Sequence, residues 1–245
     1  MNAITMMRCQ MLRKRWKFKM SEFTTGVLYP RRYENKLIKQ LPDSKQPYFH
    51  KRLNDEWNVF FLEDEWVQTA ETLQYLLDLS KLGVALLWFH DAEDSGWGFR
   101  LFDGGYEVSS ATISYILDME LAEMEMKRRY PSIIDPDDYM KEEELRKEYD
   151  ELIDTIITSQ IYRQEVQKGL SRCKPQLFRS FLPPKQIQQL HSLFDLNILV
   201  EIDNETGSSL LYDSVDLFKE ILGIEEMMWV NYSYLASGGR DSGLA

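Results

Sequence analysis

The run VALLWF at residues 84–89 constrains the fold most, because six consecutive apolar residues without polar alternation are typical of a strand buried on both faces. The next two segments, 97–102 and 106–116, alternate apolar and polar residues, as strands with one solvated face do. The Asp-Gly-Gly turn at 103–105 supplies residues that tolerate positive φ. The sequence therefore predicts an antiparallel meander in which residues 84–89 form the central strand.

Other segments extend this pattern on both sides of the meander. Residues 23–29 predict a strand, and 48–62 predict a hairpin because aromatic residues flank a polar turn. Helices are expected at 69–83, 118–130, 137–168, 184–194 and 214–223, and short strands at 198–202, 209–212 and 227–236. We therefore predict an α+β fold with a mainly antiparallel sheet packed with helices, and a helical C-terminal part with a small additional sheet. The stretch 137–168, if unbroken, would form a helix of about 48 Å.

The composition changes after residue 130 and suggests how the chain is organised. Residues 20–130 are expected to form an aromatic-rich β-meander/α subdomain, and 131–236 a helical subdomain with short strands. Residues 237–245 are rich in Gly and Ser and are expected to be a disordered tail. Residues 1–19 contain six cations and no acid, and we interpret them as sequence upstream of the native start or as a disordered arm.

The charge of the remaining chain restricts its partners. After residue 19 there are 23 Lys and Arg against 40 Asp and Glu, an excess of 17 acidic residues. A body this acidic repels phosphate backbones, so we expect no nucleic-acid binding by the folded body and a basic protein as the favoured partner. No apolar run approaches the length of a membrane helix, and two cysteines are too few for a disulfide framework. These features predict a soluble, cytoplasmic protein that does not bind a membrane. A bacterial source is assumed by the interpretation of residues 1–19 as sequence upstream of a start at Met20.

The segment HDAEDSGWG at residues 90–98 is the most unusual local sequence. His90, Asp91, Glu93 and Asp94 offer an imidazole and three carboxylates, which are ligand types for divalent cations. Their spacing matches no known metal loop, and a solvated polar turn is the simpler interpretation, so we expect no bound metal and no cofactor. Trp97, between two glycines, is either an anchor for a partner or a residue of the core.

Few other residues offer reactive chemistry. His50 could join His90 and Asp91 in a polar cluster if their strands share a sheet, whereas His191 is expected to be partly buried on a helix. Two flanking cations would lower the pKa of the Cys173 thiol, but no histidine lies close in sequence and no motif surrounds it, so a loop cysteine without special reactivity is the simpler interpretation. The chain contains no P-loop, dinucleotide-binding, nucleophile-elbow or zinc-protease motif.

Two functions remain after these observations. The first is a non-enzymatic acidic module that binds a basic partner, in the manner of an immunity protein or a regulator. It is favoured by the acidic charge, by the lack of reactive motifs, and by Trp, Tyr and Met residues suited to an interface. The alternative is a metal-dependent hydrolase that uses the acidic loop 90–98. Whether the protein is an enzyme is open between these two.

Overall fold

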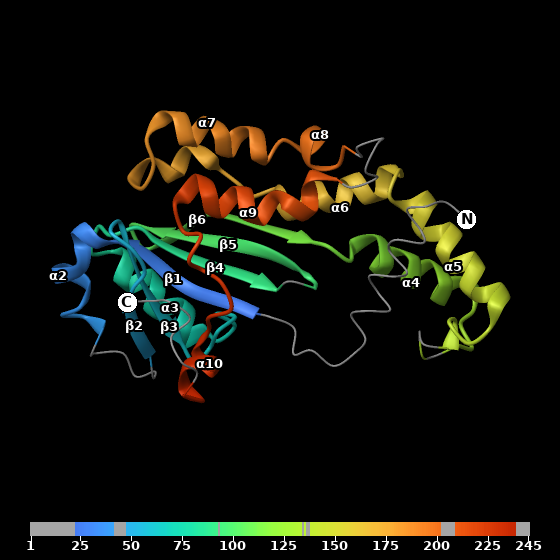
Figure 1. Ribbon diagram of the computed structural model, residues 1–245, viewed down its shortest axis with the longest axis horizontal. Helices are drawn as coiled ribbons and strands as arrows, with labels where there is room; N and C mark the ends of the chain where they lie inside the picture. The colour runs from blue at the N-terminus through green and yellow to red at the C-terminus, as the bar shows by residue number, and fades with distance from the viewer. Residues whose placement is uncertain are drawn as a thin grey trace.

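The computed structural model describes residues 23–41, 48–92, 94–133, 135, 138–201 and 209–238. The predictions made for residues 1–19, for Glu93 and for 239–245 fall outside these ranges. Within them the protein has the predicted α+β fold, with a mainly antiparallel sheet packed between helices (Figure 1).

Six strands form one antiparallel sheet in the order β2-β3-β1-β4-β5-β6. Their bounds are Phe23–Pro30 (β1), Tyr48–Arg52 (β2), Trp57–Leu62 (β3), Leu86–Ala92 (β4), Gly96–Asp103 (β5) and Tyr106–Ser114 (β6). The predicted meander and hairpin are both confirmed. Gly104 and Gly105 have φ of 60° and 87°, the positive values that the tight turn between β5 and β6 requires. The first five residues of β4 are buried, as expected for a strand covered on both faces.

Helices cover both faces of the sheet (Figure 1). On the first face lie the 3-10 turn η1 (Arg31–Tyr33), the short α2 (Glu34–Leu37) and α3 (Ala70–Ser80). Thr69 caps α3, since its side chain accepts a hydrogen bond from the backbone N–H of Thr72. On the second face lie α6 (Gln160–Leu170), η4 (Pro175–Ser180), α7 (Pro184–Leu193), α8 (Leu196–Leu199) and α9 (Leu210–Leu222).

The core of the second face is built from aromatic side chains that come from both halves of the chain. Phe89 and Phe99 of the sheet pack on Phe218 of α9, and the rings of Phe99 and Phe218 are parallel within 10° at 5.4 Å. Phe178 of η4 meets Phe99 edge to face at 5.2 Å. Sheet and C-terminal helices therefore share one hydrophobic core. A subdomain boundary after residue 130 stays a prediction.

Helix 137–168 is not continuous, and this expectation was wrong. α5 (Glu143–Ile156) ends before Ile157, and α6 begins after Ser159. The Ser159 side chain accepts a hydrogen bond from the backbone N–H of Tyr162 and so acts as an N-cap. The cap allows the chain to turn from α5 onto the sheet.

The small additional sheet predicted for the C-terminal part is not formed by the described residues. Helix replaces most of its three expected strands. Residues 196–199 form α8 and 210–222 form α9, whose buried side chains recur at helical spacing: Leu211, Val215, Phe218 and Leu222. The expected strand 227–236 contains α10 (Tyr232–Ala236) and, at Trp229, a φ of 52° that no regular strand adopts.

α4 (Leu117–Arg129) and α5 form an arm that extends from the end of the sheet (Figure 1). The arm has a small core of its own, made by Ala122, Met126, Tyr139 and Tyr149. Arg129 of α4 forms an ion pair with Glu148 of α5 at 2.5 Å.

Candidate interaction surface

The residues of the 90–98 segment do not converge on one site among those the structure describes. β4 continues to Ala92, so His90 and Asp91 are neighbours within a strand and their side chains lie on opposite faces of the sheet. Asp94 is half-buried in the turn between β4 and β5. The segment is therefore divided between the two cores.

His90 lies on the first face, between two tryptophans. Its ring centroid is 5.2 Å from that of Trp66 and 4.9 Å from that of Trp88. A Cβ atom at Gly98 would lie 2.7 Å from its Nε2, so the glycine makes room for the ring. Nδ1 is buried without a hydrogen-bond partner, and burial lowers the pKa of His90 to about 4. His90 is therefore neutral at neutral pH.

Asp91 lies on the second face and is paired. Its Oδ2 atom is 2.5 Å from Nζ of Lys219 on α9, and the two side chains are only 15% and 7% exposed. The Lys219 ammonium also lies 5.7 Å from the centre of the Phe89 ring. Removing either charge would leave the other buried and uncompensated. This ion pair ties α9 to β4.

Trp97 belongs to the core. It is fully buried, its ring lies 4.8 Å from that of Phe218, and its Nε1 donates a hydrogen bond of 2.8 Å to Oγ of Ser214. Of the two roles considered for Trp97, the structure shows the core residue. Trp97 is therefore not an exposed anchor for a partner.

The cluster of His50 with His90 is not formed. His50 is on β2, which β3 and β1 separate from β4, so the two strands lie about 14 Å apart at 4.8 Å per strand. His50 Nε2 instead lies 2.8 Å from the hydroxyl of Tyr29. Burial lowers the pKa of His50, and burial raises that of Tyr29 to about 12.

Two further expectations from the sequence were wrong. His191 is exposed on α7 rather than partly buried. Burial raises the pKa of the Cys173 thiol to about 12, and this outweighs the neighbouring cations that were expected to lower it.

Within the described ranges, no three His, Cys, Asp or Glu side chains are grouped so that they could hold a metal ion. In the same ranges, no helix is both long and apolar enough to cross a membrane.

Comparison of the chain with protein-family models, curated proteins and solved structures gives no match.

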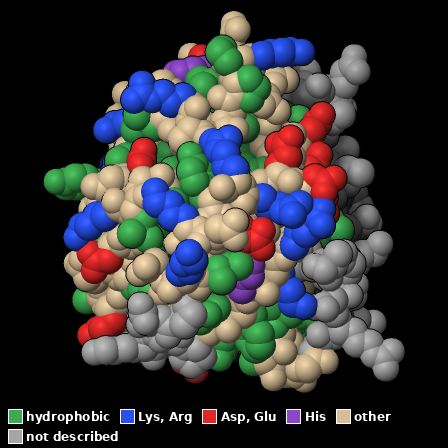
Figure 2. Space-filling model, turned by 90° about the vertical axis from the view of Figure 1, so that its left-hand side faces the viewer, with side chains coloured by type: hydrophobic (Ala, Val, Ile, Leu, Met, Phe, Trp, Pro, Cys, Tyr) green, Lys and Arg blue, Asp and Glu red, His purple; other side chains and the backbone are tan. Residues whose placement is uncertain are grey.

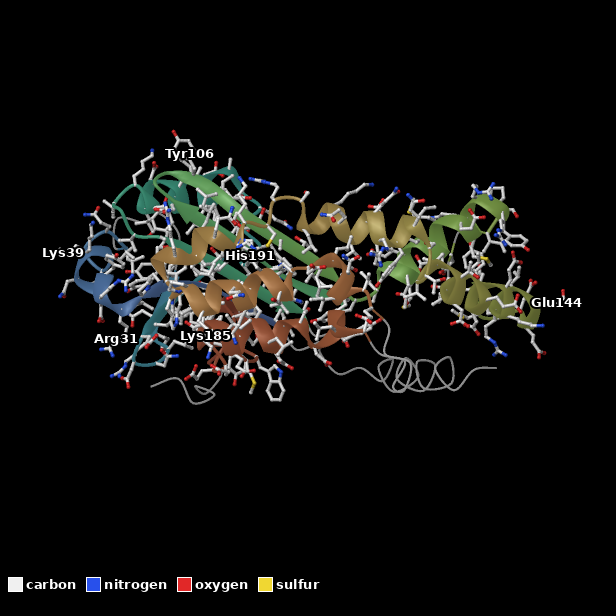
Figure 3. The ribbon with its side chains drawn as sticks, turned by 90° about the horizontal axis from the view of Figure 1, so that it is seen from above. Arg31, Lys39, Tyr106, Glu144, Lys185 and His191 are labelled. Atoms are coloured by element: carbon white, nitrogen blue, oxygen red, sulfur yellow. The ribbon has the colours of Figure 1, made fainter. Side chains whose placement is uncertain are left out.

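Charge is distributed unevenly along the molecule. Arg31, Lys39 and Lys185 lie at one end, and Glu144 lies at the far end of the arm (Figure 3). The face around α2 shows many Lys and Arg side chains although the chain as a whole is acidic (Figure 2). The excess of acid is therefore concentrated away from α2.

An exposed aromatic surface lies at the opposite end of β1 from α2. There the segment after α9 descends past the sheet to α10 (Figure 1) and pairs with the first residues of β1. The backbone N–H of Thr25 donates to the carbonyl of Val230 at 3.0 Å. The N–H of Trp229 donates to Oγ1 of Thr24 at 2.6 Å. The N–H of Ser233 reaches Oε1 of Glu65 at 2.7 Å, so the segments around Glu65 and Trp229 are neighbours.

Large apolar side chains remain exposed on these two segments. Trp66 is 42% exposed, Met228 51%, Trp229 54% and Tyr234 37%. Together with the neighbouring carboxylates they form what we call the tryptophan surface: Glu63, Glu65, Trp66, Met228, Trp229 and Tyr234. Val67 and Trp229 both adopt a φ of 52°, a strained value for residues with a Cβ atom.

The tryptophan surface is acidic. Residues 53–80 and 220–239, which supply it, contain no Lys or Arg. Arg31 follows the other end of β1, about 26 Å away at 3.3 Å per residue, which is several Debye lengths at physiological salt. This surface was not predicted from the sequence, although EDEW and IEEMMW both combine an acidic run with a tryptophan and contain no cation, which was a usable signal.

Proposed function

We propose that this protein is a non-enzymatic module of the bacterial cytoplasm that binds a basic protein at the tryptophan surface. The observation that carries the proposal is the exposure of Trp66 and Trp229 on two adjoining segments that contain carboxylates and no cation. A role like that of an immunity protein or a regulator is consistent with such binding.

The chemistry of this surface suits a protein interface. Tryptophan and methionine are enriched where proteins meet, and a few buried aromatic anchors supply most of the binding energy. Surrounding carboxylates attract a basic partner and raise its association rate. Side-chain oxygens of Thr24 and Glu65 accept hydrogen bonds from backbone N–H groups of the 229–233 segment and hold both segments in place, so little conformational entropy is lost when the partner binds.

The proposal is tested by capturing a basic partner from the native host and measuring its binding kinetics against salt. Raising salt from about 0.05 to 0.5 M shortens the Debye length from roughly 14 to 4 Å. We expect this to slow association much more than it speeds dissociation. Recovery of nucleic acid alone, or of no basic partner, would refute the proposal.

Variants then locate the interface. Trp66→Ala should speed dissociation and weaken binding by about 2 kcal/mol, since it removes an anchor. Tyr106→Ala is the matched control, because Tyr106 is a 72% exposed aromatic residue at the start of β6, outside the tryptophan surface (Figure 3). Equal effects of the two substitutions would place the interface elsewhere.

The metal-dependent hydrolase receives no support from the described residues of the 90–98 segment, because His90 and Asp91 lie on opposite faces and Lys219 already pairs with Asp91. Calorimetry would reverse this ranking if it gave micromolar metal affinity that Asp91→Asn and Glu93→Gln both abolish.

A further inference from the structure

We propose that the tryptophan surface selects arginine side chains of its partner over lysine side chains. This inference rests on the proposed function and adds the chemical group that is recognised. It follows from two exposed indole rings and two carboxylates on two segments that the hydrogen bond between Ser233 and Glu65 joins.

Trp66 is partly exposed, and its ring packs on other rings of the protein. Its ring stacks on Phe23, with centroids 4.6 Å apart and planes 23° apart, and it also contacts His90. Thr25 Oγ1 and Trp88 Nε1 both donate to the carbonyl of the preceding residue, Glu65, at 3.1 and 3.0 Å. The indole is therefore held in one orientation while 42% of the residue stays accessible.

Trp229 is positioned by its backbone rather than by other rings. Its N–H is fixed to Thr24, and no aromatic ring of the described residues packs against its indole. With 54% of the residue exposed, its ring is available to a ligand. The left-handed φ of 52° costs free energy, and two hydrogen bonds maintain it: the N–H of Trp229 donates to Oγ1 of Thr24, and the carbonyl of Val230 accepts from the N–H of Thr25.

Carboxylate oxygens lie on the same segments. Glu63 is exposed, and no described residue forms an ion pair with it. Glu65 uses Oε1 to accept the N–H of Ser233, which leaves Oε2 for a second donor. The segment that carries the Trp66 indole therefore also carries two carboxylates that can pair with a ligand cation.

Guanidinium matches this combination better than ammonium does. It is planar and weakly hydrated, so it stacks on an indole face, and its fork of N–H groups can donate two hydrogen bonds to one carboxylate. Ammonium is a compact, strongly hydrated charge that gains less from stacking. The neutral state of His90, which contacts Trp66, adds no repulsion to an incoming cation.

The test uses two short synthetic peptides of equal charge, one alternating arginine with glycine and the other lysine with glycine, titrated calorimetrically into the full chain. We expect the arginine peptide to bind about tenfold more tightly. Trp66→Ala and Trp229→Ala should each reduce this preference, whereas Tyr106→Ala should retain it. Glu63→Gln, an exposed substitution that keeps the fold, should weaken both peptides.

The outcomes separate this inference from the proposed function. Equal binding of both peptides, or a preference that survives both tryptophan substitutions, overturns arginine selection. Neither result contradicts the proposed binding of a basic protein. Binding of neither peptide, together with failure to capture a basic partner, overturns both. A thermal melt of each variant shows that it is folded, and Trp66→Phe replaces Trp66→Ala if the smaller side chain prevents folding.

Discussion

Protonation of His90 should make the protein less stable at mildly acidic pH. The pKa of His90 is lowered from 6.5 to about 4 because the ring is buried between Trp66 and Trp88. The unfolded chain therefore takes up a proton below pH 6.5, while the folded chain resists it until about pH 4. The stabilising contribution is complete above pH 6.5 and is lost as the pH falls toward 4.

The size of this effect follows from the same two pKa values. One pKa unit corresponds to about 1.4 kcal/mol, so the complete loss is at most about 3.5 kcal/mol. At pH 5 the linkage relation gives a loss of about 2 kcal/mol relative to neutral pH. That is a large fraction of the stability of an ordinary domain.

Urea unfolding of the wild type and of His90→Gln at a series of pH values from 7 to 5 measures this effect directly. Glutamine does not titrate, so the free energy of unfolding should fall with pH about 2 kcal/mol less in the variant than in the wild type. Carboxylates titrate in both proteins and cancel in the difference. Parallel curves would show that His90 is not buried in its neutral form, and the reasoning would be refuted.

Three other substitutions test the core. Asp91→Asn should destabilise the protein by about 3 kcal/mol in urea unfolding because Lys219 stays buried without its partner, and the double variant with Lys219→Met should recover part of that loss. Trp97→Ala should lower stability by about 3 to 5 kcal/mol whether or not a partner is bound, and a thermal melt showing no change would place Trp97 outside the core. Gly98→Ala should lower the melting temperature, since its Cβ would lie 2.6 Å from the carbonyl oxygen of Ala111; a melting temperature equal to that of the wild type would contradict the close approach of β5 and β6.

The sheet was predictable where local pattern and tertiary structure agree. The apolar run at 84–89, the alternation after it and the Asp-Gly-Gly turn all specify the same meander, and β4, β5 and β6 form it. The C-terminal part was less predictable because its apolar runs are short. SLLY at 209–212 fits a strand on its own. Val215, Phe218 and Leu222 continue its apolar face at helical spacing, however, and the segment forms the helix α9.

The site predicted at residues 90–98 is not formed, and the reason is related. His90 and Asp91 were expected at the start of a loop, where neighbouring side chains can face one volume. β4 extends as far as Ala92, and in a strand successive side chains point to opposite faces. The ion pair between Asp91 and Lys219 joins residues 128 positions apart, and no local pattern reveals such a contact.

The pairing of Val230 with Thr25 has a consequence for synthesis of the chain. Thr24 of β1 is synthesised 205 positions before Trp229, yet the backbone N–H of Thr25 and the side chain of Thr24 receive their partners only from residues 229 and 230. In a nascent chain that has not reached Val230, these polar groups at the start of a central strand can therefore bond only to water. This end of the sheet is therefore completed only after residues 229 and 230 have been synthesised, and the tryptophan surface exists only then.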